Sequence, residues 1–321
     1  MCALNQLQPS DVGHSHHCCA QDVAIHLMLE QGNSGSGLAV PHPSPGANIA
    51  PLGAVASPAA VGADLCAKYI AAENQIRLGK AQDATHGLQV LLGLSDTALG
   101  QILLDPVAAI RHEFEQQGGI DQFNFEQIIG GTFGDGKTLG ELMTHEHSQL
   151  AKLKVHHVLA LRLYTSSSYA RVNDPLRTDP PTRPHPFAAT AHFITEGIKM
   201  LRAVAASLPD AHETRIYWRG MRDIGLTMEF MQKGGTEFGC LSTSASKDVA
   251  TNFAASALPL IFKFETKDFT SRGADISFLS VYPAEKEALY PPLTYLRAVK
   301  TEKETLGSID MLVATVEPVF M

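Results

Sequence analysis

One stretch of the chain fits the phosphate-binding P-loop pattern G-x-x-x-x-G-K-[ST]. It runs from Gly131 to Thr138 and reads GTFGDGKT. In that pattern, backbone N–H groups and the lysine, here Lys137, hold the phosphates of a nucleoside triphosphate. The pattern has this meaning only where a buried hydrophobic strand enters the loop and a helix leaves it.

The surroundings of GTFGDGKT do not supply that context. The preceding residues, GGIDQFNFEQIIGG, indicate at most a weak strand, and no parallel series of strand, helix and strand is evident. The nearest acidic residues that could assist magnesium binding lie in LIFKFETKD, in a different part of the chain. We therefore favour a glycine-rich turn that caps a helix beginning near Thr138.

Three other short polar stretches follow one another in the C-terminal half. They are IYWRG with Arg219, CLSTSASKDVATNF with Ser242, Thr243 and Ser244, and YPAEKEALYPP with Glu285 and Glu287. Because alternate residues of a strand share a face, Glu285 and Glu287 are expected to point into one cleft and Lys286 away from it. Each stretch alone also has an ordinary explanation, as a surface ion pair, an edge-strand or turn feature, or a solvated strand face.

Taken together, the order, spacing and flanks of these stretches resemble one family. YWRG, STS and YPAEKEALYPP are similar to the three signatures of the R-S-E class of mono-ADP-ribosyltransferases, whose members bind NAD in one cleft. The third stretch matches the family's common form, aromatic-Pro-x-E-x-E-hydrophobic-x-Pro-Pro. Upstream, LRLYTSSSYARVNDPLR resembles the helix before the family's first strand. The resemblance covers about residues 155–321 and does not extend to the first 150.

The resemblance implies an enzyme that transfers ADP-ribose from NAD to arginine side chains of a protein. It implies that Glu287 stabilises an oxocarbenium-like transition state and bonds the ribose 2′-hydroxyl. Glu285 is expected to pair with the attacking guanidinium and assist its loss of a proton. Arg219 is expected to hold the NAD phosphates and the nicotinamide-side ribose, and Gly220 to let the carboxamide reach the backbone.

The same resemblance assigns several supporting residues. Ser242 is expected to hydrogen-bond Glu287 and hold its orientation, with Ser244 on the same face of the strand. Phe253 either lines the nicotinamide pocket or belongs to the core. Tyr282, just before the E-x-E loop, is expected to meet the acceptor protein.

Two other functions stay open. An NAD glycohydrolase would use water in place of the guanidinium, and a non-catalytic module would only bind the nucleotide. We expect NAD as the co-substrate, no metal, and a protein with an exposed arginine as the partner. The net charge of -8 gives no general reason to bind nucleic acid.

The pattern along the chain predicts an α+β fold. Apolar residues recur at spacings of three and four from residue 64 to 154, and two further helical segments follow, VHHVLALRLYTSSSYARV and AATAHFITEGIKMLRAVAASL. After Thr214, alternating segments predict strands: TRIYWRG, TEFGCLSTS, LPLIFKFET, DISFLSVYP, TYLRAVK and MLVATVEPVF. Helices followed by strands indicate α+β. The resemblance implies a split, mainly antiparallel two-sheet core with an N-terminal helical region and the NAD cleft between the sheets.

Composition divides the chain into three parts. Residues 1–62 are rich in Pro, Gly, Ser and Ala, which predicts a disordered low-complexity tail. Residues 63–154 are expected to form a helical region of unknown role, and the resemblance implies that residues 155–321 form the ADP-ribosyltransferase catalytic domain. The tail carries metal-ligand residue types, but their spacing does not suit a tetrahedral ion, and we expect no specific metal site. They are His14, His16, His17, Cys18 and Cys19. Acylation of the adjacent cysteines stays open.

The N-terminal part also bears on location. Its first 67 residues contain no Lys or Arg, whereas secretory signals and transit peptides carry positive charge. The run ANIAPLGAVASPAAVGA is broken by Pro and Gly, which suits a linker better than a membrane span. The five cysteines are an odd number and do not resemble a disulfide framework. We therefore expect a cytoplasmic protein without a membrane span.

Overall fold

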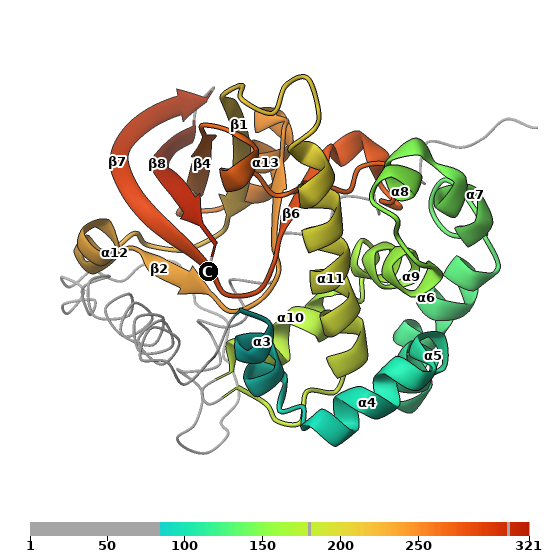
Figure 1. Cartoon of the computed structure of the whole chain (residues 1–321). Helices are drawn as coiled ribbons and strands as arrows, with labels where there is room; N and C mark the ends of the chain where they lie inside the picture. The colour runs from blue at the N-terminus through green and yellow to red at the C-terminus, as the bar shows by residue number, and fades with distance from the viewer. Residues whose placement is uncertain (1–83, 179–180, 307–308, 321) are drawn as a thin grey trace, which may run out of the picture.

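The computed structural model describes residues 84–178, 181–306 and 309–320. In Figure 1 these residues form a helical part and a curved sheet that adjoin along the helix α11. The expected tail at 1–62, with its histidines and cysteines, lies outside the described residues. The helical prediction can be compared with the structure from residue 84 onward.

Six helices form the first part of the described chain. They are α3 (Ala84–Leu92), α4 (Asp96–Leu104), α5 (Pro106–Gln117), α6 (Gly119–Ile129), α7 (Leu139–Thr144) and α8 (Glu146–Leu150). Their starts follow ordinary capping rules: the Ser95 hydroxyl accepts from the Ala98 N–H at 3.1 Å, and Asp105 caps α5 just before Pro106. The helical prediction for this region is confirmed within the described residues.

The stretch GGIDQFNFEQIIGG, which has little strand character, contains helix α6, in agreement with the helical prediction for residues 64–154. Its buried residues, Asp121, Asn124, Phe125 and Ile128, recur at helical spacing. The Phe125 ring packs against Phe114 of α5, with 5.8 Å between ring centroids. The few apolar residues are thus enough to bury one side of a helix.

Three further helices follow in the chain before the sheet. They are α9 (Val155–Tyr164), α10 (Tyr169–Arg177) and α11 (Ala188–Ala205). Predicted as one helical block, α9 and α10 are separated by a turn in which the Thr165 and Ser166 hydroxyls donate to the carbonyls of Arg162 and Leu163. Helices α9 and α11 pack closely, since a Cβ added at Gly197 would lie 2.8 Å from Leu161 Cδ1.

Eight strands form a single sheet in the order β2-β7-β8-β4-β1-β3-β6-β5. They are β1 (Arg215–Met221), β2 (Gly235–Glu237), β3 (Leu241–Ser244), β4 (Leu260–Thr266), β5 (Ala274–Asp275), β6 (Glu287–Tyr290), β7 (Thr294–Leu306) and β8 (Ile309–Val319). Only β4 and β8 pair in parallel, so the sheet is mainly antiparallel. The prediction of an α+β fold with N-terminal helices is confirmed.

Four short helices connect the strands. They are α12 (Met228–Lys233), α13 (Lys247–Ala254) and the 3-10 turns η3 (Phe269–Ser271) and η4 (Pro283–Glu285). The strand expected in DISFLSVYP is largely wrong. Only Asp275 belongs to a strand, and the Leu279 and Ser280 N–H groups bond back to the Ile276 carbonyl in a turn. Residues 276–286 therefore form a loop between β5 and β6.

The expected pair of sheets is one sheet with a weak junction. Strands β1 and β3 are joined by the single pair Trp218 and Ser244. The Ser242 carbonyl accepts a hydrogen bond from Arg219 Nη1 at 2.7 Å. An arginine side chain of β1 is thus bonded to a backbone carbonyl of β3 near this junction. The junction divides the sheet into a five-stranded part and the group β3-β6-β5.

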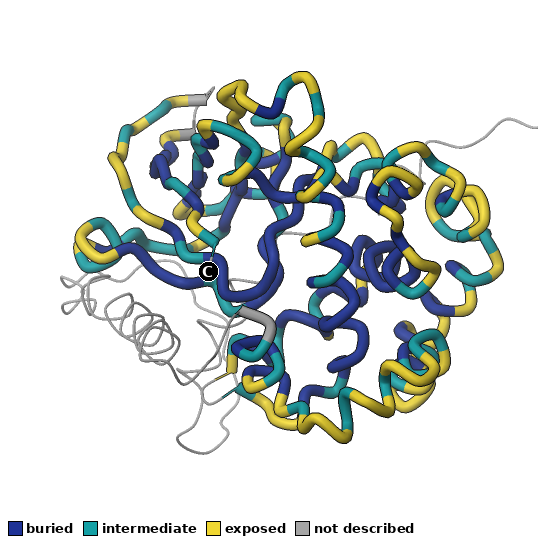
Figure 2. Tube along the Cα trace, viewed as in Figure 1, coloured by how far each residue is buried: buried dark blue, intermediate teal, exposed yellow. Residues whose placement is uncertain are grey.

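Buried residues concentrate where the helical part meets the sheet. Figure 2 shows them along α9, α11 and the inner strands, whereas the outer sides of α4, α5 and α7 are exposed. No single helix among the described residues is long and apolar enough to cross a membrane. The bent pair His86–Leu92 and Asp96–Leu104 meets such a test by length and composition only, with an angle of 95° between its halves.

Candidate active site

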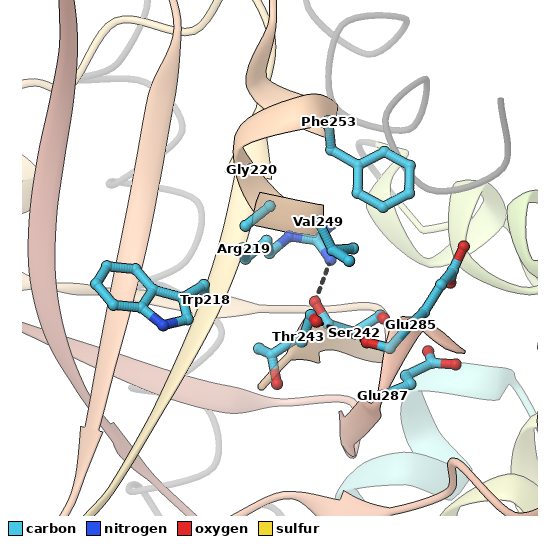
Figure 3. Close-up of a pocket in the computed structure, with 11 residues that line it drawn as sticks. Trp218, Arg219, Gly220, Ser242, Thr243, Val249, Phe253, Glu285 and Glu287 are labelled. Atoms are coloured by element: carbon cyan, nitrogen blue, oxygen red, sulfur yellow. Dashed lines mark hydrogen bonds between the residues drawn. The ribbon is translucent and has the colours of Figure 1, made fainter. Parts of the chain in front are cut away.

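A cleft of about 340 Å³ opens at the junction between β1 and β3. Its walls come from β1, β3, α13, η4 and the start of β6. The structure brings together in this cleft every residue that the sequence placed in the catalytic or NAD-binding set: Arg219, Gly220, Ser242, Ser244, Phe253, Glu285 and Glu287 (Figure 3). These residues come from segments as far apart as β1 and β6, so the tertiary fold assembles the cleft.

Arg219 lies in the middle of β1 and is 8% exposed. Tyr217 and Met221 lie two residues before and after it on β1, and both belong to a cluster of buried hydrophobic residues. The strand therefore directs the guanidinium inward, where Nη1 donates to the Ser242 carbonyl. A charged fork of donors held in this way is suited to binding an anionic group.

A half-buried acid, Glu237, also contributes charge near Arg219. Glu237, at the end of β2, accepts from Arg177 Nε at 2.9 Å and from the Gly239 N–H at 2.8 Å. Burial raises the pKa of Glu237, but the charge and hydrogen bond of Arg177 and the charge of Arg219 outweigh burial and lower the pKa below its usual value. The negative charge of Glu237 is thus held by Arg177 and attracts the positive charge of Arg219. No motif marks Glu237 in the sequence.

The three hydroxyl residues of β3 have different partners. Ser244 is paired in register with Glu287, and its hydroxyl donates to the Glu285 carbonyl at 2.6 Å. The Thr243 hydroxyl donates to the Ala288 carbonyl at 2.8 Å. The Ser244 hydroxyl, which we expected to serve NAD binding, is therefore used in the structure to hold the backbone of the E-x-E segment.

Glu285 and Glu287 both line the cleft, but not because they alternate along one strand. Glu285 is the last residue of η4, Lys286 has a left-handed backbone with φ 49°, and Glu287 begins β6. The turn at Lys286 lets both carboxylates line the cleft (Figure 3), while Lys286 itself is exposed. Glu287 is the deeper acid, only 4% exposed, and Glu285 lies nearer the rim.

Both acids have pKa values near neutrality. Burial raises the pKa of Glu287 to about 7, the interaction with the Ser242 side chain opposes this, and the charge of Glu285 adds to it. Burial also raises the pKa of Glu285 to about 7. A cation that enters the cleft would favour the ionised form of each carboxylate. The pair is thus suited to stabilising positive charge and to accepting a proton.

Gly220 is required by packing in this structure. A Cβ at this position would lie 1.9 Å from the Ala250 carbonyl oxygen and 2.7 Å from the Ala254 nitrogen, both in the backbone of α13. The family resemblance predicts a different reason for this glycine, the approach of a carboxamide to the backbone. Helix α13 occupies the space into which a Cβ of Gly220 would project. The absence of a side chain therefore allows α13 to pack directly against β1.

Helix α13 contributes Phe253 to the cleft. The side chain is half-buried, and Figure 3 shows its ring directed toward the side of the cleft where Glu285 lies. Of the two readings of Phe253, the structure places it as a lining residue; its contact with nicotinamide stays a prediction. Tyr282, half-buried, lies immediately before η4.

Trp218, Thr243 and Val249 also line the cleft, although the sequence reasoning did not assign them to it. The Lys247 amine lies over the Trp218 ring, 4.9 Å from its centroid. Trp218 could have been identified from the sequence, because it immediately precedes Arg219 in the YWRG stretch. No feature of the sequence marks Val249 as a cleft residue, because a valine on a short helix usually belongs to the core.

The GTFGDGKT stretch lies outside the cleft, in the loop between α6 and α7. A helix precedes it, and Lys137 Nζ pairs with Asp135 at 3.0 Å. Thr138 caps helix α7, with a reciprocal hydrogen-bond pair to Glu141. The alternative that we favoured, a turn capping a helix that begins near Thr138, is confirmed. Among the residues that the structure describes, no group of three or more His, Cys, Asp or Glu is arranged to hold a metal ion.

Comparison with known proteins adds a family to this geometry. The model of the family described as "NAD:arginine ADP-ribosyltransferase" matches residues 139–313, more than half of the chain. Ecto-ADP-ribosyltransferase 5 of Rattus norvegicus is 28% identical over 147 residues, which are 43% of this chain and 45% of that protein. The chain thus spans less than half the length of this curated relative.

Two solved structures match this chain at low sequence identity. The type III effector XopAI from Xanthomonas axonopodis pv. citri has 16% sequence identity and a TM-score of 0.44, over 78% of this chain and 99% of that one. The ADP-ribosyltransferase HopU1 of Pseudomonas syringae pv. Tomato DC3000 has 17% identity and a TM-score of 0.43, over 62% and 97% respectively.

Proposed function

We propose that this chain, which belongs to the NAD:arginine ADP-ribosyltransferase family, transfers ADP-ribose from NAD to arginine side chains of a protein and releases nicotinamide. One observation carries the proposal: Arg219, Ser242, Glu285 and Glu287 converge on a single cleft.

The residues of the cleft suit NAD as a substrate. Arg219 brings a positive charge that is held by the Ser242 carbonyl and balanced by nearby acids, and it would bind the NAD phosphates. Phe253 offers an aromatic face to the nicotinamide ring. In this arrangement the positive end of the substrate lies toward the two carboxylates and the anionic part toward the arginine.

Glu287 would stabilise the transition state. Cleavage of the bond between nicotinamide and ribose develops positive charge on the ribose, and a buried, fixed carboxylate lowers the energy of that charge. Register with Ser244 and the interaction with Ser242 hold Glu287 in place. Because the catalytic form is the ionised one, the raised pKa of Glu287 links turnover to pH.

Glu285 would act on the acceptor. It lies at the rim of the cleft, where a guanidinium from another protein can pair with it before attacking the ribose. A carboxylate with a pKa near 7 can assist the loss of a proton from that guanidinium during the attack. Tyr282, next to η4, would contact the acceptor protein as part of the same proposal.

The test uses NAD and agmatine, a small guanidine, with nicotinamide release and the agmatine adduct measured separately. The proposal expects both products from the wild-type protein. Nicotinamide without adduct would instead indicate an NAD glycohydrolase. Neither product would leave a module that only binds the nucleotide.

Two variants assign the acids. Glu285→Gln is expected to lose the adduct but to retain hydrolysis of NAD, because only the acceptor step needs this carboxylate. Glu287→Gln is expected to lose both products by about a hundredfold or more. Wild-type nicotinamide release by folded Glu287→Gln protein would refute the catalytic assignment, and equal loss of both products in Glu285→Gln would refute the division of roles.

A further inference from the structure

We infer that Arg162 and Asp135, outside the cleft, are positioning residues that hold the loop carrying Glu285 through the GTFGDGKT stretch. The inference rests on the proposed function, because it assigns Glu285 to the acceptor. It gives a role to a motif that nucleotide binding does not explain. The loop concerned is residues 276–286, between β5 and β6.

Arg162 is the direct link to this loop. It lies on α9, is 1% exposed, and its Nη1 donates to the carbonyls of Leu279 at 2.9 Å and Ser280 at 2.6 Å. Its Nη2 donates to the Phe133 carbonyl at 3.2 Å and to Asp135 Oδ1 at 2.5 Å. One guanidinium therefore joins the loop before Glu285 to the GTFGDGKT loop.

The GTFGDGKT loop also touches the 276–286 loop directly. Gly134 has a positive φ of 62°, and a Cβ added there would lie 2.6 Å from the Val281 carbonyl oxygen and 2.9 Å from Val281 Cα. The glycine thus lets the two backbones meet. This requirement accounts for Gly134, which stands at an unspecified position of the P-loop pattern, between the pattern's own glycines Gly131 and Gly136.

A second hydrogen bond and a ring contact complete the attachment. The Val281 N–H donates to the Thr165 hydroxyl at 3.0 Å, and this hydroxyl donates to the Arg162 carbonyl at 2.8 Å. The Phe278 ring stacks on His145, with 4.4 Å between centroids and an interplanar angle of 16°. The helical region thus contacts the loop at several consecutive positions.

Glu285 lies between this attachment and β3. Its carbonyl accepts from the Ser244 hydroxyl, and its N–H donates to the Tyr282 carbonyl at 3.0 Å. Only three residues separate Val281 from Glu285, so a shift of Val281 is transmitted to the acceptor-side carboxylate. The rim of the cleft is therefore built in part by residues of the helical region.

The chemistry of Arg162 favours positioning over simple core filling. A buried charge is costly, and an apolar side chain of similar volume often stabilises a core as well or better. Arg162 instead directs four hydrogen bonds to two loops in fixed directions. Burial raises the pKa of Asp135, but hydrogen bonds from Arg162 and Lys137 outweigh this and lower it, which keeps the carboxylate charged opposite the guanidinium.

The test compares three alanine substitutions in the same loop. Asp135→Ala removes the partner of Arg162, and Gly134→Ala pushes on Val281 without changing any charge. Thr132→Ala is the matched control, because Thr132 is exposed and its hydroxyl bonds to Gln127 of helix α6 rather than to Arg162 or the 276–286 loop. Hydrogen exchange of the peptide 279–286 reports on the loop, and adduct formation with agmatine and hydrolysis of NAD report on the cleft.

We expect faster exchange in both positioning variants and an agmatine adduct rate reduced by about tenfold or more, since small misplacements of a reacting group are costly. NAD hydrolysis should stay within about threefold of wild type, because Glu287 is held by β3 and β6. The control should match wild type in all readouts. If Asp135→Ala does not fold, the same three measurements on Gly134→Ala decide whether the inference holds.

Unchanged exchange, or faster exchange with an unchanged adduct rate, overturns the inference. Equal loss of adduct formation and hydrolysis also overturns it, since the effect would then be general. A wild-type protein without either product refutes the proposed function instead. In that case the exchange measurement still decides whether Asp135 and Gly134 hold the loop.

Discussion

Replacement of Glu287 by glutamine should stabilise the protein at high pH while abolishing its chemistry. Glu287 is 4% exposed, and its pKa is raised from 4.5 to about 7. Between these two values the native state keeps a proton that the unfolded chain has lost. The unfolded state then binds fewer protons, so the free energy of unfolding falls as pH rises through this range.

The size of this effect follows from the shift in pKa. Each pKa unit corresponds to about 1.4 kcal/mol, so the ionisation of Glu287 costs the native state about 3 kcal/mol once the pH exceeds the native value. Glutamine resembles the protonated acid and does not titrate. The variant and the wild type should therefore differ little in this respect at about pH 5, and the variant should gain about 3 kcal/mol relative to the wild type by about pH 8.

The assay is urea unfolding of both proteins at several pH values, read by circular dichroism. Glu115→Gln on α5, where the side chain is exposed, is the control and should follow the wild type at every pH. A difference between Glu287→Gln and wild type that does not change between about pH 5 and about pH 8 would refute the reasoning, because a buried acid must then be ionised without cost.

Three further predictions concern the cleft. Nicotinamide release should rise with pH through about 7 as Glu287 ionises, and a flat profile between about pH 6 and pH 8 would contradict this. Gly220→Ala should lower the free energy of unfolding by about 1 to 3 kcal/mol, because its Cβ meets a carbonyl of α13, whereas Gly100→Ala, in open space on α4, should raise it slightly in thermal melts. Arg219→Lys should weaken NAD binding about tenfold or more by losing the planar fork of donors; fluorescence of the single tryptophan, which lines the cleft, measures this, and an unchanged Kd would exclude the proposed contact.

The sequence allowed most of the helices and strands to be predicted. The apolar spacing of the N-terminal region and the alternation after Thr214 correspond to α3–α8 and to most of the strands. The clear error is the strand expected in DISFLSVYP, where the Leu279 and Ser280 N–H groups bond to the Ile276 carbonyl in a turn. In α6, the packing of Phe125 on Phe114 is a tertiary contact that the local pattern does not contain.

The site was predictable by residue type but not by geometry. Its arginine, serines and acids lie in short stretches whose order resembles a family, and they do meet in one cleft. The sequence could not show that Ser244 holds the backbone of Glu285, or that Glu237 lies near Arg219. Such contacts join strands that are distant along the chain, and local spacing does not contain that information.

The GTFGDGKT stretch illustrates which features follow from the sequence alone and which follow only from the tertiary structure. The sequence by itself determined the cap of α7 at Thr138 and the need for a tight glycine-rich turn, because capping and backbone freedom are local. Only the tertiary structure decided that this turn packs against the loop before Glu285. The contacts of Arg162 span 117 and 118 positions of the chain, and the burial that raises the pKa of Glu287 likewise arises only when distant segments pack together.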